Sequence, residues 1–156
     1  MSETQSKFPT EMVDLPSQGL LYPEGHPLSS GKIELKYMTA REEDILTSAN
    51  LIEKGVVIDQ LLKSLIVTKV DYGDIFIGDK NAIMLAARIF GYGKTYNNEV
   101  TCPNCSTKED TPFDLTQLKY KKIDPKKYNR NNIFEFTLPN AERKIEFKML
   151  KHKDEE

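Results

Sequence analysis

Strict alternation between polar and apolar residues marks two parts of the chain as β-structure. Residues 32–37 read Lys-Ile-Glu-Leu-Lys-Tyr, which predicts a strand with one buried face. Residues 134–138 and 145–149 alternate in the same way on either side of a turn at residues 139–142. We therefore predict that this second part is an antiparallel hairpin, also with one buried face.

A helical period appears in the middle of the chain. Five apolar residues recur at the spacing that places them on one helix face: Ile58, Leu61, Leu62, Leu65 and Ile66. They predict a helix from about residue 58 to residue 68. Because burial contributes roughly 1.5–3 kcal/mol for each such side chain, this stripe is the main candidate for the core.

Capping signals predict a further helix on each side of this one. Thr39 and Glu42 have the spacing of a capping box, in which each side chain accepts a hydrogen bond from the other residue's amide. A helix should therefore start there and end near Asn50. Asp79 as N-cap and Gly91 just past the last turn delimit a third helix.

The segment before the first predicted strand combines two opposed signals. Three prolines and three glycines between residues 16 and 31 disfavour regular structure, yet the apolar residues among them argue against a solvated linker. We expect an extended arm that lies on a surface, either of its own domain or of a partner. The working hypothesis is a partner, with these contact residues: Leu15, Pro16, Leu20, Leu21, Tyr22 and Pro23.

The two cysteines of the chain form one motif, Cys-Pro-Asn-Cys at residues 102–105. This spacing lets two thiolates bind one zinc ion from a tight turn, as each half of a zinc ribbon does. Cys102 and Cys105 are therefore candidate Zn²⁺ ligands. The alternative is a plain tight turn between two short strands, without metal.

Few other residues are suited to complete a zinc site, which takes four ligands in structural centres. His26 and His152 are far away in sequence, and the nearer carboxylates of Glu109 and Asp110 are poor substitutes. A thioredoxin-like redox role is disfavoured because the motif does not lie between a strand and a helix start. Two cysteines are also too few for a disulfide scaffold, so we expect reduced or metal-bound thiols.

Composition narrows the functional classes. The 156 residues carry a net charge of −2, with 38% hydrophobic and 29% charged residues, which fits one domain with a modest core. The sequence has neither a transmembrane run nor the apolar core of a signal peptide, so we expect a protein made and kept in a cytoplasm. No catalytic set or phosphate-loop spacing is evident, and the protein is predicted not to be an enzyme.

Basic residues are concentrated between residues 119 and 130, where two tyrosines are interleaved with them. Such a mixture is typical of proteins that bind single-stranded nucleic acid. The acidic balance of the whole chain argues against that function. We favour a solvated loop that faces an acidic partner.

Five segments, in this order, resemble one protein family: LPSQGLLYP, KYMTAREEDIL, LLKSLI, GDKNAIMLAARIFGYG and VTCPNC. They are similar to the baseplate hub subunits of T-even-type contractile-tail bacteriophages. The resemblance implies a late-expressed protein of the virion tail baseplate, assembled in the host bacterial cytoplasm. Its implied partners are other phage baseplate and tail proteins, with no nucleic acid and no membrane. Members of that family extend past the hairpin into a helical tail, so the resemblance also implies a short or truncated member.

We therefore predict an α+β fold in four regions. These are an extended N-terminal arm at 1–31, a mainly helical core of about three helices at 32–93, a CxxC knuckle with short antiparallel strands at 94–118, and a basic loop, β-hairpin and charged tail at 119–156. The functional hypothesis is a baseplate hub structural or assembly protein that acts through protein–protein contacts. One alternative is a tail assembly chaperone, for example for the tape measure, that is absent from the mature virion. The second is a zinc-ribbon-like nucleic-acid-binding module.

Overall fold

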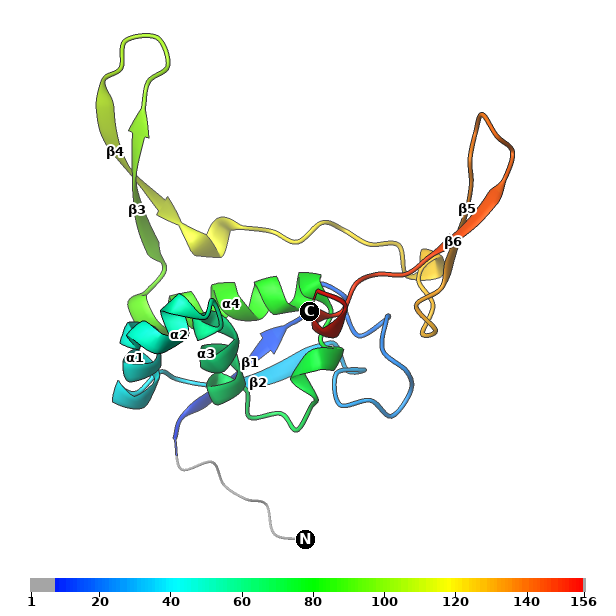
Figure 1. The fold of residues 1–156 in the computed structure, drawn as a ribbon, viewed down its shortest axis with the longest axis horizontal. Coiled ribbons are helices and arrows are strands. Elements are labelled where there is room, and N and C mark those ends of the chain that lie inside the picture. The colour runs from blue at the N-terminus through cyan, green and yellow to red at the C-terminus, as the bar shows by residue number, and fades with distance from the viewer. Residues whose placement is uncertain (1–7, 156) are drawn as a thin grey trace, which may run out of the picture.

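Two β-hairpins project away from a helical body in the computed structural model, which describes residues 8–155 (Figure 1). Within these residues the structure has four helices and three two-stranded antiparallel sheets, which confirms the α+β class. The helices are α1 (Ala40–Thr47), α2 (Ala49–Glu53), α3 (Val57–Leu65) and α4 (Ile77–Tyr92). The strands are β1 (Thr10–Asp14), β2 (Lys32–Lys36), β3 (Thr95–Thr101), β4 (Lys108–Asp114), β5 (Phe134–Thr137) and β6 (Lys144–Phe147). Residues 1–7 of the predicted arm lie outside the described residues.

The strand predicted at residues 32–37 is β2, and its apolar residues point into the core as the alternation predicts. Ile33 and Leu35 are fully buried, whereas Lys32 is exposed and Glu34 and Lys36 are half-buried. Its partner is β1, which pairs with it in an antiparallel register from Thr10 opposite Lys36 to Asp14 opposite Lys32. The sequence analysis places β1 inside the arm and does not predict it as a strand. The sheet therefore begins in the segment that was expected to be irregular.

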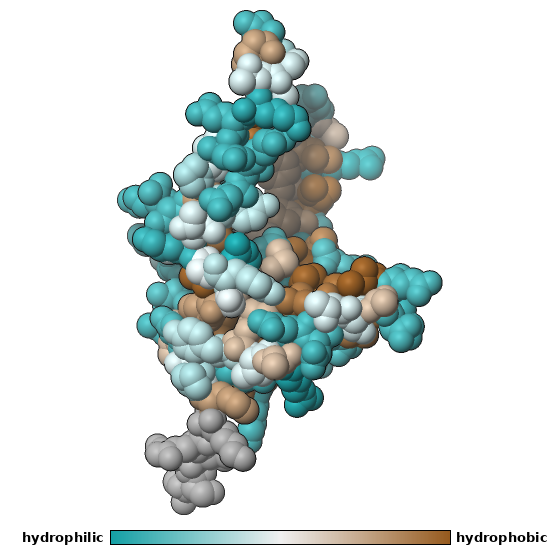
Figure 2. All heavy atoms as spheres, turned by 90° about the vertical axis from the view of Figure 1, so that its left-hand side faces the viewer, coloured by the Kyte–Doolittle hydropathy of each residue, from teal (hydrophilic) through white to brown (hydrophobic). Residues whose placement is uncertain are grey.

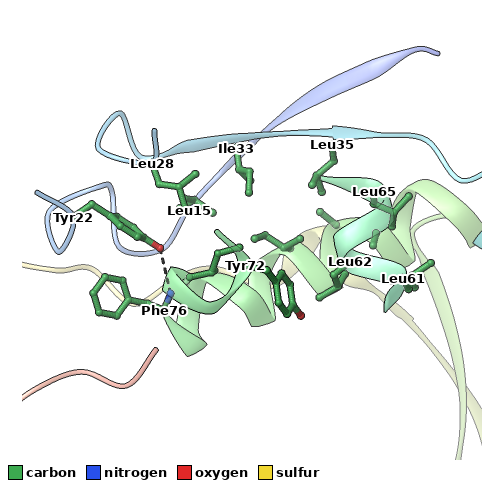
Figure 3. Close-up of a cluster of buried hydrophobic side chains, with 14 of the residues drawn as sticks. Leu15, Tyr22, Leu28, Ile33, Leu35, Leu61, Leu62, Leu65, Tyr72 and Phe76 are labelled. Atoms are coloured by element: carbon green, nitrogen blue, oxygen red, sulfur yellow. Dashed lines mark hydrogen bonds between the residues drawn. The ribbon is translucent and has the colours of Figure 1, made fainter. Parts of the chain in front are cut away.

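The core lies between this sheet and helices α3 and α4 (Figure 3). From the predicted stripe, Leu61, Leu62 and Leu65 are buried on α3, while Ile58 at the start of the helix is 37% exposed. On the α4 side, Ile83 is fully buried. The helix stripe is therefore confirmed as a core element at its three leucines, whereas Ile66 is half-buried and lies just past the end of α3.

The capping box predicted at Thr39 is present, and Glu42 does more than cap the helix. The Thr39 amide donates a hydrogen bond to the Glu42 carboxylate at 2.9 Å. This carboxylate is fully buried and also accepts hydrogen bonds from Lys36 at 2.7 Å and Ser64 at 2.6 Å. Burial alone raises the pKa of Glu42, but these hydrogen bonds outweigh it and lower the pKa to about 2. Glu42 thus joins β2, α1 and α3.

Four helix boundaries differ from the prediction. The helix predicted at residues 58–68 ends at Leu65, because Ile66 has an extended backbone. The first helix does not continue to Asn50, because Ser48 has an extended backbone and separates α1 from α2. The third helix begins at Ile77 with Phe76 as N-cap, so Asp79 lies inside its first turn and does not cap it. At its other end the cap is Gly93, whose φ of +80° suits glycine, and not Gly91.

The predicted C-terminal hairpin is present, but most of its apolar face is exposed. Strands β5 and β6 pair as expected, with Phe134 opposite Phe147 and Phe136 opposite Ile145. The expectation of a buried face holds only at its base, where Phe134 is half-buried and packs against the core cluster. The rest of the face is exposed because the hairpin extends beyond the body (Figure 1). No helix within residues 8–155 combines the length and the apolar character that crossing a membrane requires.

Candidate functional site

The predicted arm lies on the protein's own core and not on an external groove. Of the six proposed contact residues, Leu15, Leu21 and Tyr22 are buried. Pro16 and Leu20 are half-buried, and Pro23 is exposed. The structure thus corrects the expectation of an arm free to lie on a partner, and supports the alternative that the arm covers its own domain. A partner contact through the exposed part of the arm stays a prediction.

Gly19 and Gly31 hold the arm in a closed loop. The Leu15 amide donates a hydrogen bond to the Gly31 carbonyl at 2.8 Å, which brings the two ends of the loop together. Gly31 has a φ of +74°, and a Cβ there would lie 2.7 Å from the carbonyl carbon of Gln18. Only glycine fits so close a contact between backbones, so the glycines shape the arm more than they loosen it.

Asp79 connects the arm to α4. Its carboxylate accepts hydrogen bonds from the Ser17 amide at 3.0 Å, from the Ser17 hydroxyl at 2.7 Å and from the Tyr22 hydroxyl at 2.8 Å. Burial raises the pKa of Asp79, although these hydrogen bonds act in the opposite direction. Burial and the nearby Asp79 charge likewise raise the pKa of Tyr22. The three donors account for Asp79 as a structural contact.

A second polar cluster ties the C-terminal segment to the helices. Asp59 of α3 accepts a hydrogen bond from the Tyr72 hydroxyl at 2.8 Å and pairs with Lys80 of α4 at 3.0 Å. The Lys80 ammonium also lies 3.0 Å from Nδ1 of His152, which is buried. Burial alone raises the pKa of Asp59, but its hydrogen bonds with Tyr72 and Lys80 outweigh it and lower the pKa. The sequence analysis missed this cluster, because its members are far apart in sequence and no local pattern links them.

Several exposed apolar residues lie together on the β5–β6 hairpin and the segment that follows it. Phe136 is 52% exposed, Ile145 41% and Phe147 45%, and the two cross-strand pairs put them on one face with Phe134. Leu150, beyond β6, is 53% exposed. The opposite face carries Glu135 opposite Glu146. The same face carries Thr137 opposite Lys144, so the hairpin has one apolar face and one polar face of mixed charge.

An apolar groove lies between the start of α4 and the segments that flank this hairpin. One part has a volume of about 420 Å³ and is lined by Phe76 and Ile77 at the start of α4 and by Tyr128, Met149 and Leu150, among others. The adjoining part, about 390 Å³, shares Tyr128 and Met149 and is edged by three basic residues: Lys121, Lys122 and Lys127. The basic segment predicted to face an acidic partner thus forms the rim of an apolar groove.

Cys102 and Cys105 lie in the turn between β3 and β4, at the tip of the other projecting hairpin (Figure 1). Cys102 is half-buried and Cys105 is exposed. The Cys105 thiol donates a hydrogen bond to the Thr107 hydroxyl at 3.2 Å. This hydroxyl, the Thr107 amide and the Cys102 thiol stabilise the thiolate form and lower the pKa of Cys105.

A structural zinc site takes four ligands, and the turn has two thiols. Within residues 8–155, no group of three or more His, Cys, Asp and Glu side chains is arranged to hold a metal ion. Glu109 and Asp110, the nearest acidic residues in sequence, are in β4, opposite Val100 and Glu99. The residues present therefore fit half of a zinc site, and zinc binding remains a prediction.

A family of known proteins matches most of this chain. The family model described as T4 bacteriophage base plate protein matches residues 11–156. Comparisons with curated proteins and with solved structures give no match. The matched range includes the core, both projecting hairpins and the polar cluster around His152.

Proposed function

The chain belongs to the T4 bacteriophage base plate protein family, and from this premise we propose that it is a structural component of the baseplate hub that acts through protein–protein contacts. The observation that carries this proposal is the uncovered apolar face of the β5–β6 hairpin. The family places the protein among phage baseplate proteins, and the hairpin offers a surface through which it can bind a neighbour there.

A two-stranded hairpin is only marginally stable in water by itself. A partner that covers the apolar face would supply the missing stability. Phe136 and Ile145 form a directly opposed cross-strand pair, and both are more than two-fifths exposed. Contiguous exposed apolar surface with a polar rim is typical of protein interaction sites. A baseplate neighbour that covers this face would bury the pair and stabilise the hairpin.

The charges around the groove indicate the character of that neighbour. Beside Phe134 and Met149, the groove is lined by three lysines and one acidic residue, so that basic charge is in excess: Lys121, Lys122, Lys127 and Asp124. A segment with apolar residues flanked by carboxylates complements such a groove, since rim charges select and orient a partner. We therefore propose that the neighbour presents an acidic, apolar segment to this surface.

The test compares how well two matched double variants of the chain are incorporated into virions. Phe136→Ser with Ile145→Ser removes the apolar pair, and Glu135→Gln with Glu146→Gln changes the opposite face of the same hairpin. We expect mass spectrometry of purified virions to detect the wild-type chain and the glutamine variant, and to detect little of the serine variant. The melting temperature of the purified serine variant should be unchanged, because both side chains are exposed.

Two results would overturn the proposal. If virions lack the wild-type chain although tails form, the protein is a tail assembly chaperone and not a hub subunit. If the serine variant is incorporated as well as wild type, the β5–β6 face is not the interface.

A further inference from the structure

The backbone of the β3–β4 turn holds the two cysteines in a defined arrangement. The Cys102 amide donates a hydrogen bond to the Thr107 carbonyl at 2.9 Å, and the Ser106 amide donates one to the Cys102 carbonyl at 2.9 Å. Ser106 has a φ of +57°, a left-handed conformation that lets the chain reverse directly after Cys105. Two cysteines at this spacing can bind one ion from a tight turn. Both sulfurs can therefore reach one metal ion.

The same hairpin cannot complete a metal site from its own chain. Zinc in a structural site takes four ligands in tetrahedral geometry. Among the described residues, no third side chain of a ligating type joins the two cysteines. The β3–β4 hairpin also projects away from the helical body (Figure 1). With no further ligand among residues 8–155, another molecule would have to supply the rest of the site.

We propose that the turn is half of a zinc site which a second copy of this chain completes, with Cys102 and Cys105 of each copy forming a four-thiolate centre. A second copy is the occupant that the structure favours because it brings the same two-cysteine turn at the tip of an equally accessible hairpin. Two such turns related by a twofold axis supply identical pairs of ligands, and this symmetry is the commonest in homo-oligomers. This inference does not depend on the proposed baseplate role.

The surface of the hairpin explains why a metal ion would be needed for this association. All residues of β3, and all of β4 except Asp114, are exposed. Figure 2 shows this hairpin, at the top of the view, mostly in hydrophilic colours. Two polar hairpins gain little from burial of surface, so zinc–thiolate bonds would have to hold the tips together.

The experiment uses the full chain, purified under reducing conditions without metal and then exposed to zinc alone. Bound zinc is measured by elemental analysis after desalting, and mass is measured by light scattering during size-exclusion chromatography. We expect one zinc ion retained per two chains and a mass that doubles from 17.9 kDa, with both effects reversed by a chelator. Cobalt in place of zinc should give the absorption spectrum of a tetrahedral four-thiolate centre.

Matched variants assign the effect to the cysteines. Cys102→Ser and Cys105→Ser should each abolish zinc retention and dimer formation, whereas Glu109→Gln should leave both unchanged. Their melting curves should match the wild type, because the hairpin lies outside the core. One zinc ion per chain with an unchanged mass would overturn the proposal. It would also fail if no zinc is retained, or if a dimer forms equally well in the cysteine variants.

Discussion

The Tyr22 hydroxyl donates a hydrogen bond to the Asp79 carboxylate at 2.8 Å, although 57 residues separate them in the chain. The same hydroxyl lies 3.3 Å from the Phe76 amide and accepts a hydrogen bond from it, as Figure 3 shows. Tyr22 therefore forms hydrogen bonds with two buried polar groups at the start of α4, the Phe76 amide and the Asp79 carboxylate. The N-terminal arm is thus attached to the body by specific hydrogen bonds as well as by its leucines.

Tyr22→Phe should lower the free energy of unfolding by about 1–3 kcal/mol, because it leaves the buried Phe76 amide without this acceptor and removes one donor from Asp79. Urea unfolding at neutral pH measures the change. Tyr96→Phe is the control, since Tyr96 is 47% exposed on β3. Its effect should stay within about 0.5 kcal/mol. Equal effects of the two variants would contradict the role assigned to Tyr22.

Removal of residues 1–31 should prevent cooperative folding of the remainder. The deletion takes away β1 and the buried side chains of Leu15, Tyr22 and Leu28, and it exposes Ile33 on the open side of β2. It also leaves Asp79 buried without its three donors. Circular dichroism during heating measures the outcome. A truncated chain that melts in one sharp transition would show that the arm is separate from the core.

Leu62→Ala should destabilise the protein by about 2–5 kcal/mol, because Leu62 is fully buried and its loss creates a cavity. Ile58→Ala, on the same predicted stripe, should cost about 1 kcal/mol or less, since Ile58 is 37% exposed. Chemical unfolding of both variants compares the two positions directly. Similar losses at both positions would mean that the two side chains are equally buried.

Glu42→Gln should destabilise the protein by about 1.5–3 kcal/mol at pH 7, since Glu42 is a buried carboxylate with charged and neutral donors. The ordinary pKa of 4.5 falls to about 2 on folding, so the charged group stabilises the fold above pH 4.5. This contribution is lost as the pH falls from 4.5 through about 2. The difference between wild type and variant should therefore shrink over that range.

Unfolding curves at a series of pH values measure this difference. Glu43→Gln is the matched control, because Glu43 is in the same helical turn but exposed. Its effect should be a few tenths of a kcal/mol, about the size of a helix-dipole contribution at an exposed position. A difference for Glu42→Gln that stays constant from pH 7 to pH 2 would contradict the pKa shift.

Patterns that depend on neighbouring residues predicted the local structure well. The alternation at residues 32–37, the capping box at Thr39 and the stripe with Leu62 at its centre each correspond to a feature of the fold. These features could be predicted because the periods of strands and helices follow from local geometry. Boundaries were less accurate: Asp79 matches an N-cap pattern, but its side chain accepts hydrogen bonds from Ser17 and Tyr22.

The sequence by itself determined the α+β class, the pairing of β5 with β6, the core face of α3 and the resemblance to phage baseplate proteins. Only the tertiary structure decided that the arm with Leu15 and Tyr22 covers the core, and that the face with Phe136 and Ile145 stays open. Both segments carry apolar residues in the sequence, so composition could not distinguish them. Burial depends on which surfaces the chain brings together over long separations, and the path of residues 115–133 leaves the hairpin beyond the reach of the helices (Figure 1).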